Sequence, residues 1–132
     1  MANALYPKYK EALLTAGVNL TTANIKVALV DTGTYTYSAA HQFMSSAAAG
    51  TVARSGNLAN KTVVSGVFDA DNITITGVSG STVEAVIIFR DTGVDATSEL
   101  LAYYDAGITG IVLTPNGGDV LVTFNVSGIF AL

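Results

Sequence analysis

The chain has no cysteine, no tryptophan and a single histidine in its 132 residues. The lack of cysteine excludes disulfide bonds and thiolate chemistry. His41 alone cannot form a multi-histidine metal site, and a histidine-centred triad would depend on this one residue. We interpret His41 as a polar position on a short helix.

Charged side chains are also scarce. They make up 12% of the chain, against about 25% in ordinary soluble domains. Depletion of charge marks the cores of protein interfaces, so we expect extensive contact with other protein. The alternative is that Thr, Ser, Asn and Gly supply the polar surface. With six basic residues and a net charge of −4, a nucleic-acid partner is not expected.

Long hydrophobic runs are missing, although half of the residues are hydrophobic and the mean hydropathy is +0.48. No run approaches the roughly 20 apolar residues of a membrane-spanning helix. The first residues, Met-Ala-Asn-Ala-Leu-Tyr-Pro-Lys, lack a basic segment followed by an apolar stretch. We therefore expect no signal peptide and no membrane partner.

The strongest structural signal is an unbroken apolar run from Ala85 to Phe89, between Glu84 and Arg90. Its β-branched residues favour a strand over a helix. An unbroken run leaves no face for solvent, so Val83–Arg90 is predicted to be a central strand that is buried on both sides. Ile87 and Phe89 are expected deep in the core.

Short strands are predicted along most of the remaining chain: Ile25–Val30, Thr62–Phe68 with a bulge at Gly66, Asn72–Thr76, Glu99–Tyr104, Ile111–Leu113, Val120–Asn125 and Ile129–Leu132. In Tyr103-Tyr104, one ring should be buried and the other exposed. Roughly seven to nine short strands with one helix indicate a mainly β fold, an antiparallel β-sandwich or jelly-roll-like domain. No repeat or linker interrupts residues 1–132, so we expect a single domain.

The one clear helix is predicted over Ala4–Ala16. Asn3 would cap it, Pro7 is tolerated in its first turn, and Gly17 would end it in the left-handed conformation. Its apolar stripe contains Leu5, Tyr6 and Tyr9 among others. Residues 1–17 are read either as a helix that covers one end of the sandwich or as an arm that docks on a neighbouring subunit.

The segment between Val30 and Thr62 carries weaker signals. Thr34–Tyr37 is predicted as a weak strand or extended edge with exposed Tyr35 and Tyr37. Ser38–Met44 is predicted as a short helix capped by Ser38, and Ser45–Gly50 as a mobile surface loop. Thr51–Asn60 is expected to be irregular.

The sharpest motif is Asp31-Thr32-Gly33, which follows an apolar strand as it does in aspartic proteases. A retroviral-type protease would pair two such carboxylates in a dimer. The same triplet recurs at Asp91-Thr92-Gly93, again after an apolar strand, and this repetition indicates strand-ending turns. The later apolar-apolar-Gly segment of such proteases is missing, so Asp31 is expected to be structural and the hydrolase is a minor alternative.

Asp69-Ala70-Asp71-Asn72 is similar to the opening of a calcium-binding loop. Thr74 stands where that loop needs glycine, and Gly80 stands where it needs glutamate. We interpret the segment as a turn before a strand and leave open whether Asp69 and Asp71 bind an ion.

Several segments in order resemble a group of small tailed-phage virion proteins, the capsid decoration or cement proteins. They are Ala4–Leu14, Ile25–Thr32, Val67–Thr74, Ala85–Gly93, Leu100–Asp105, Asn116–Asp119 and Gly128–Leu132. The family often has a Trp-Asp pair in its last strand, where this chain has Phe124-Asn125. The resemblance implies a non-enzymatic structural protein with no catalytic residues, cofactor or metal.

From this resemblance we expect a virion protein, made in the host cytoplasm, that binds the outside of the major capsid protein shell and clamps its subunits. A tail or fibre-adaptor protein with the same fold is the alternative. We expect a homo-oligomer, with a trimer preferred over a dimer. The expected partner contacts are Leu5, Tyr6, Tyr9, Tyr35 and Tyr37, with the Ser38–Gly50 loop as second choice.

Overall fold

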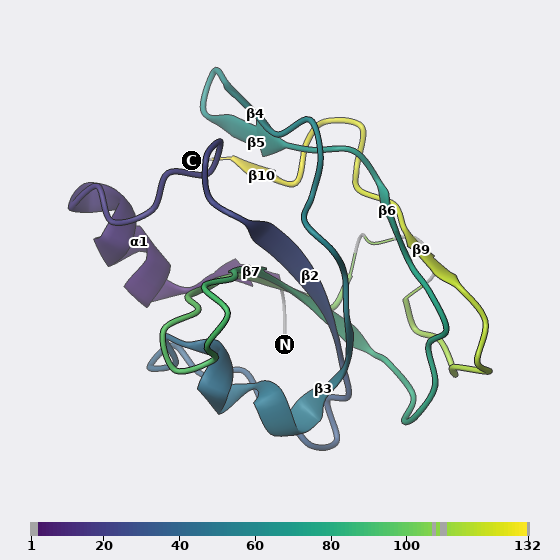
Figure 1. The fold of residues 1–132 in the computed structure, drawn as a ribbon. Helices are drawn as coiled ribbons and strands as arrows, with labels where there is room; N and C mark the ends of the chain where they lie inside the picture. The colour runs from purple at the N-terminus through teal and green to yellow at the C-terminus, as the bar shows by residue number, and fades with distance from the viewer. Residues whose placement is uncertain (1–2, 107, 109–110, 132) are drawn as a thin grey trace.

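A computed structural model describes residues 3–106, 108 and 111–131 of the chain. Its main element is a five-stranded sheet in the order β1-β8-β7-β2-β3, in which every neighbouring pair is antiparallel (Figure 1). The strands are β1 (Ala4–Leu5), β2 (Ile25–Val30), β3 (Thr51–Arg54), β7 (Ala85–Arg90) and β8 (Leu100–Tyr104). The strand that contains the unbroken apolar run, β7, therefore lies in the middle of the sheet.

The prediction of a central buried strand is confirmed, although β7 begins at Ala85 and not at Val83. It pairs with β2 along its full length, from Ile25 opposite Arg90 to Val30 opposite Ala85. Its five apolar residues, Ile87 and Phe89 among them, are 0% exposed. Since successive side chains point to opposite faces, the sheet must be covered on both sides.

Two smaller antiparallel sheets lie beside the main one (Figure 1). One has the order β10-β5-β4, and the other pairs β6 with β9. Their strands are β4 (Thr62–Val64), β5 (Val67–Asp69), β6 (Ile73–Ile75), β9 (Val120–Val122) and β10 (Phe130–Ala131). The fold is therefore mainly β, with antiparallel sheets of five, three and two strands and one N-terminal helix, and within the described residues no sheet closes into a barrel.

The two faces of the main sheet are covered by different parts of the chain, as the two tyrosines of β8 show. The Tyr104 hydroxyl donates to the Ile129 carbonyl, next to β10, at 2.6 Å. Tyr103 points the other way and packs against the rings of Tyr35 and Tyr37, in the segment after β2. Tyr103 is buried and Tyr104 is half buried, so the expectation that one of them is exposed is wrong.

The N-terminal helix α1 (Pro7–Leu14) is shorter than predicted. Its first residue is Pro7 because Ala4 and Leu5 form β1, opposite Tyr103 and Ala102 of β8. Asn3 does not cap the helix: its side chain instead bonds the backbone near Ala106. Tyr6 stands at the N-cap and makes no side-chain cap bond.

The C-terminal end of α1 also differs from expectation. Ala16, with φ of 57°, takes the left-handed conformation that was assigned to Gly17. The Gly17 N–H donates to the Ala12 carbonyl at 2.7 Å and the Ala16 N–H donates to the Leu13 carbonyl at 3.2 Å. These two bonds form a Schellman motif. The helix is therefore followed by a left-handed residue, as predicted, but this residue is Ala16 and not Gly17.

The segment between β2 and β4 departs most from expectation. Thr34–Tyr37 forms no strand, and Ser38–Met44 forms no helix. Two short 3₁₀ helices, η1 (Met44–Ser46) and η2 (Ala48–Gly50), replace the expected loop, and β3 replaces the expected irregular stretch. Met44 and Ala47 are 0% exposed, so this segment belongs to the core.

Two further strand predictions need correction. Thr62–Phe68 is not one bulged strand but the hairpin β4–β5, because Ser65 and Gly66 have φ of 53° and 79°. Positive φ at both central residues is the two-residue turn that joins antiparallel strands. In Ile111–Leu113, only Leu113 forms a bridge, to Val83.

We predict that Phe89→Ala lowers the free energy of unfolding by about 3–5 kcal/mol, the range for a fully buried aromatic side chain. Phe89 is 0% exposed, and the Arg54 guanidinium lies 5.6 Å from its ring centroid. Urea denaturation of both proteins measures the change. Val126→Ala is the control, since Val126 is 100% exposed and its truncation should stay within about 0.5 kcal/mol. An F89A protein as stable as wild type would contradict the assigned core.

Candidate functional site

Both Asp-Thr-Gly triplets end a strand in a turn, as predicted, and they share one side-chain hydrogen bond. In each, the aspartate carboxylate accepts a hydrogen bond from the glycine N–H, at 2.8 Å for Asp31 and Gly33 and at 3.0 Å for Asp91 and Gly93. Because β2 and β7 are antiparallel, Asp31 and Asp91 lie at opposite ends of this strand pair. Both carboxylates are thus engaged in ending a strand.

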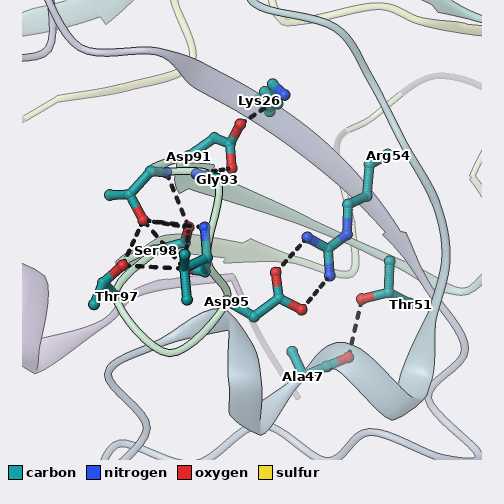
Figure 2. A network of polar contacts seen from close by, with 11 residues as sticks. Lys26, Ala47, Thr51, Arg54, Asp91, Gly93, Asp95, Thr97 and Ser98 are labelled. Carbon is teal, nitrogen blue, oxygen red and sulfur yellow. Dashed lines mark hydrogen bonds and ion pairs between the residues drawn. The ribbon is translucent and has the colours of Figure 1, made fainter.

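The second triplet belongs to a polar network in the loop between β7 and β8 (Figure 2). Lys26 pairs with Asp91 at 2.7 Å, and Arg54 binds both carboxylate oxygens of Asp95 at 2.7 and 2.8 Å. Within the loop, the Ser98 hydroxyl accepts from one backbone N–H and donates to a backbone carbonyl. The two ion pairs attach this loop to β2 and β3.

These ion pairs also shift the pKa values of the two aspartates. The Lys26 ammonium, followed by the Gly93 N–H, lowers the pKa of Asp91, and the Arg54 guanidinium lowers the pKa of Asp95. A lowered folded-state pKa contributes stability above the unfolded value of 3.8 that is lost as the pH falls. The network therefore stabilises the folded loop, and this stabilisation decreases in acid.

In the segment that is similar to a calcium-binding loop, both aspartate carboxylates accept hydrogen bonds from the protein itself. The Asp69 carboxylate accepts from the Ala70 N–H at 2.8 Å, and that of Asp71 accepts from the Asn60 amide at 2.6 Å. The Asn72 amide oxygen caps the Phe124 N–H. In residues 3–106, 108 and 111–131, no group of three or more His, Asp or Glu side chains is arranged to hold a metal ion.

The five residues expected to contact a partner have very different environments. Tyr6, Tyr9 and Tyr35 are 0%, 1% and 3% exposed, so the expectation that Tyr35 is exposed is wrong. Leu5 and Tyr37 are half buried. Tyr9 packs against Phe130, so the first two tyrosines serve the chain's own core. Contact with a partner stays a prediction, and Leu5 and Tyr37 retain surface for it.

The structure brings Tyr6, Tyr35, Tyr37 and Tyr103 together with His41. The Tyr6 and Tyr35 hydroxyls lie 2.7 Å apart, and the Tyr35 hydroxyl lies 2.9 Å from Nδ1 of His41. The Tyr37 ring is 5.0 Å from that of Tyr6 and 5.4 Å from that of Tyr103, measured between centroids. We call these four residues the tyrosine cluster. Sequence reasoning placed Tyr35 and Tyr37 on one segment and Tyr6 and Tyr103 on two others, and did not anticipate their meeting.

A cavity of about 410 Å³ opens beside the tyrosine cluster. It is lined by Thr32, Tyr35, Thr36, Tyr37, Glu84, Tyr103, Asp105 and Val112. Burial, then the negative charges of Asp105 and Glu84, raises the pKa of the Tyr103 hydroxyl, which shows that both carboxylates act on this ring. The cavity thus combines aromatic walls with acidic groups.

A second hollow is apolar. This groove of about 440 Å³ lies between the end of α1, the following loop and the hairpin strand β4. Its apolar lining consists of Leu13, Ala16, Val18, Leu20 and Val63. Val63 and the next residue, Val64, are 51% and 66% exposed, and Leu14 on the helix is 88% exposed. The only sequence sign of this surface was a pair of valines in a short strand.

Comparisons with known proteins assign no family to the chain. No protein-family model matches it, and no curated protein matches it in sequence. The described part of the chain also holds no helix with the length and apolar character needed to cross a membrane. The resemblance to phage virion proteins therefore stays a prediction.

We predict that Tyr35→Phe destabilises the protein by about 1–3 kcal/mol, because the Tyr6 hydroxyl would stay buried and lose its partner. Thermal or urea unfolding measures the loss. Tyr37→Phe is the matched control in the same cluster and should change stability by less than about 0.5 kcal/mol. Equal effects of the two substitutions would contradict the role assigned to the Tyr35 hydroxyl.

We also predict that the protein unfolds in alkali. Burial raises the pKa of Tyr6, Tyr9 and Tyr104 above the usual 10.0. The unfolded chain then loses protons at a pH where the folded chain holds them, so the contribution of these tyrosines to stability is constant below about pH 9 and falls above about pH 10. Unfolding free energies measured across this range, with tyrosinate absorbance alongside, test it. Tyrosines that ionise near pH 10 without unfolding would contradict the buried environment.

Proposed function

We propose that the protein is a structural component of a bacteriophage virion that binds the outer surface of the capsid and clamps neighbouring subunits of the major capsid protein. The composition supports this proposal, because a chain with 12% charged residues is suited to extensive protein contact. The mainly β architecture supports it as well, since a packed body presents its contact surface without ordering a flexible segment.

The observation that carries the proposal is the apolar groove lined by Val63, with the exposed Val64 next to it. β4 is the edge strand of its sheet and hydrogen-bonds only to β5 among the described strands. All three of its residues are exposed. Exposed apolar edge strands are sites where another chain can add, by strand pairing or by filling the groove. In the proposed function this surface meets the capsid.

The structure changes which variants can test this function. β1 is hydrogen-bonded to β8, and Tyr6 and Tyr9 are buried in the core. Removal of residues 1–16 would therefore damage the fold and could not report on binding alone. Substitutions on the surface of the groove leave the core intact.

The test is to mix the purified protein with capsids that lack it and to measure co-sedimentation. We expect the wild type to sediment with capsids and Val63→Thr/Val64→Thr to bind about tenfold more weakly or worse, because two buried methyl contacts are lost. Val126→Thr is the matched control, since Val126 is 100% exposed and does not line the groove.

A wild-type protein that never sediments with capsids would overturn the proposal. Binding to purified tails in place of capsids would also overturn it and would favour a tail component. Wild-type affinity of the double variant would reject the groove as the contact surface. Light scattering of the free protein measures its oligomeric state, for which we expect a trimer.

A further inference from the structure

The cavity beside the tyrosine cluster has walls of a kind that attract cations. The rings of Tyr35, Tyr37 and Tyr103 line it, with centroids of the last two 5.4 Å apart. Tyr35 and Tyr103 are held almost completely inside the protein, while Tyr37 is half buried on the open side. The faces of aromatic rings carry partial negative charge. Of the three rings, that of Tyr37 is therefore the one with surface open to a ligand.

The Glu84 carboxylate adds negative charge to the same cavity. Glu84 and Asp105 line it, and both raise the pKa of the Tyr103 hydroxyl after burial has done so. One oxygen of Glu84 accepts a hydrogen bond of 3.3 Å from the Thr32 N–H. Its other oxygen has no hydrogen-bond donor among the described residues. This carboxylate can therefore accept a donor from a ligand.

The protein does not supply a basic side chain to this cavity from its described residues. In the same part of the chain, four of the six Lys and Arg side chains form ion pairs elsewhere: Lys8 with Glu11, Lys26 with Asp91, Arg54 with Asp95 and Arg90 with Glu99. Lys61 bonds the Ala23 carbonyl. These five basic side chains are therefore engaged outside the cavity.

We propose that this cavity binds the guanidinium group of an arginine side chain presented by a partner protein, with the Glu84 carboxylate as its acceptor and the half-buried Tyr37 ring as its stacking surface. A guanidinium is planar and stacks on aromatic faces, and its fixed N–H donors match a carboxylate. The volume of about 410 Å³ lies in the range of pockets that hold a small ligand. The inference goes beyond capsid binding and does not require it.

The cavity can be tested with a small probe. We expect N-acetyl-arginine methylamide, titrated into the ¹⁵N-labelled full chain, to shift amide signals around Thr32, Glu84 and Tyr103. The citrulline analogue, which is neutral and of the same shape, should bind about tenfold more weakly, because a charge-assisted hydrogen bond is lost. Equal binding of the two probes, no shifts at these residues, or tighter binding of the lysine analogue would overturn the proposal.

Substitutions test which residues bind the arginine probe. Glu84→Gln keeps an oxygen for the Thr32 N–H and removes the charge, so we expect it to fold and to bind the arginine probe about tenfold more weakly. Glu11→Gln makes the same change on exposed α1 and should leave binding unchanged. Tyr37→Leu removes an aromatic wall and should also weaken binding. Wild-type affinity of folded E84Q or of Y37L would overturn the assignment, whatever the outcome with capsids.

Discussion

The whole fold depends on one constraint, the burial of β7 on both of its faces. Ile87 and Ile88 point to opposite sides of the main sheet, and both are 0% exposed. An apolar strand in this position stabilises the protein only if two independent layers exclude water from it. The small sheets provide one layer, and the segment from Tyr35 to η2, with Met44 and Ala47 at its centre, provides the other.

The second layer contains more than apolar groups. Its tyrosines bring hydroxyls into the interior, where each must find a partner. The contact of Tyr35 with both Tyr6 and His41 meets this demand and joins the N-terminal helix to the layer. Where the layer ends, Tyr37 and Tyr103 meet Glu84 and Asp105, and an acidic aromatic cavity remains. The cavity is thus a consequence of how the main sheet is covered.

The few charged side chains form local ion pairs. Lys26 and Arg54 attach the loop after β7 to the sheet, while exposed valines and leucines occupy the surface near β4 and the end of α1 (Figures 1 and 2). Such a surface has few charges to repel a partner and has apolar area to bury. The proposed attachment to a capsid uses this property, and the arginine cavity would add a single specific contact on another surface of the molecule.

The sequence by itself determined the elements whose signal is local. β2 and β7 are mostly apolar strands, and both Asp-Thr-Gly turns follow from side chains that bond a backbone N–H two residues away. Only tertiary structure decided the rest. Ala4 and Leu5 have helical spacing, but pairing with β8 makes them a strand. The tyrosine cluster joins Tyr6, Tyr35 and Tyr103, which are distant in sequence, through contacts between their hydroxyls and rings. No local sequence pattern predicts these contacts, because they depend on which face each strand presents after the sheets have packed.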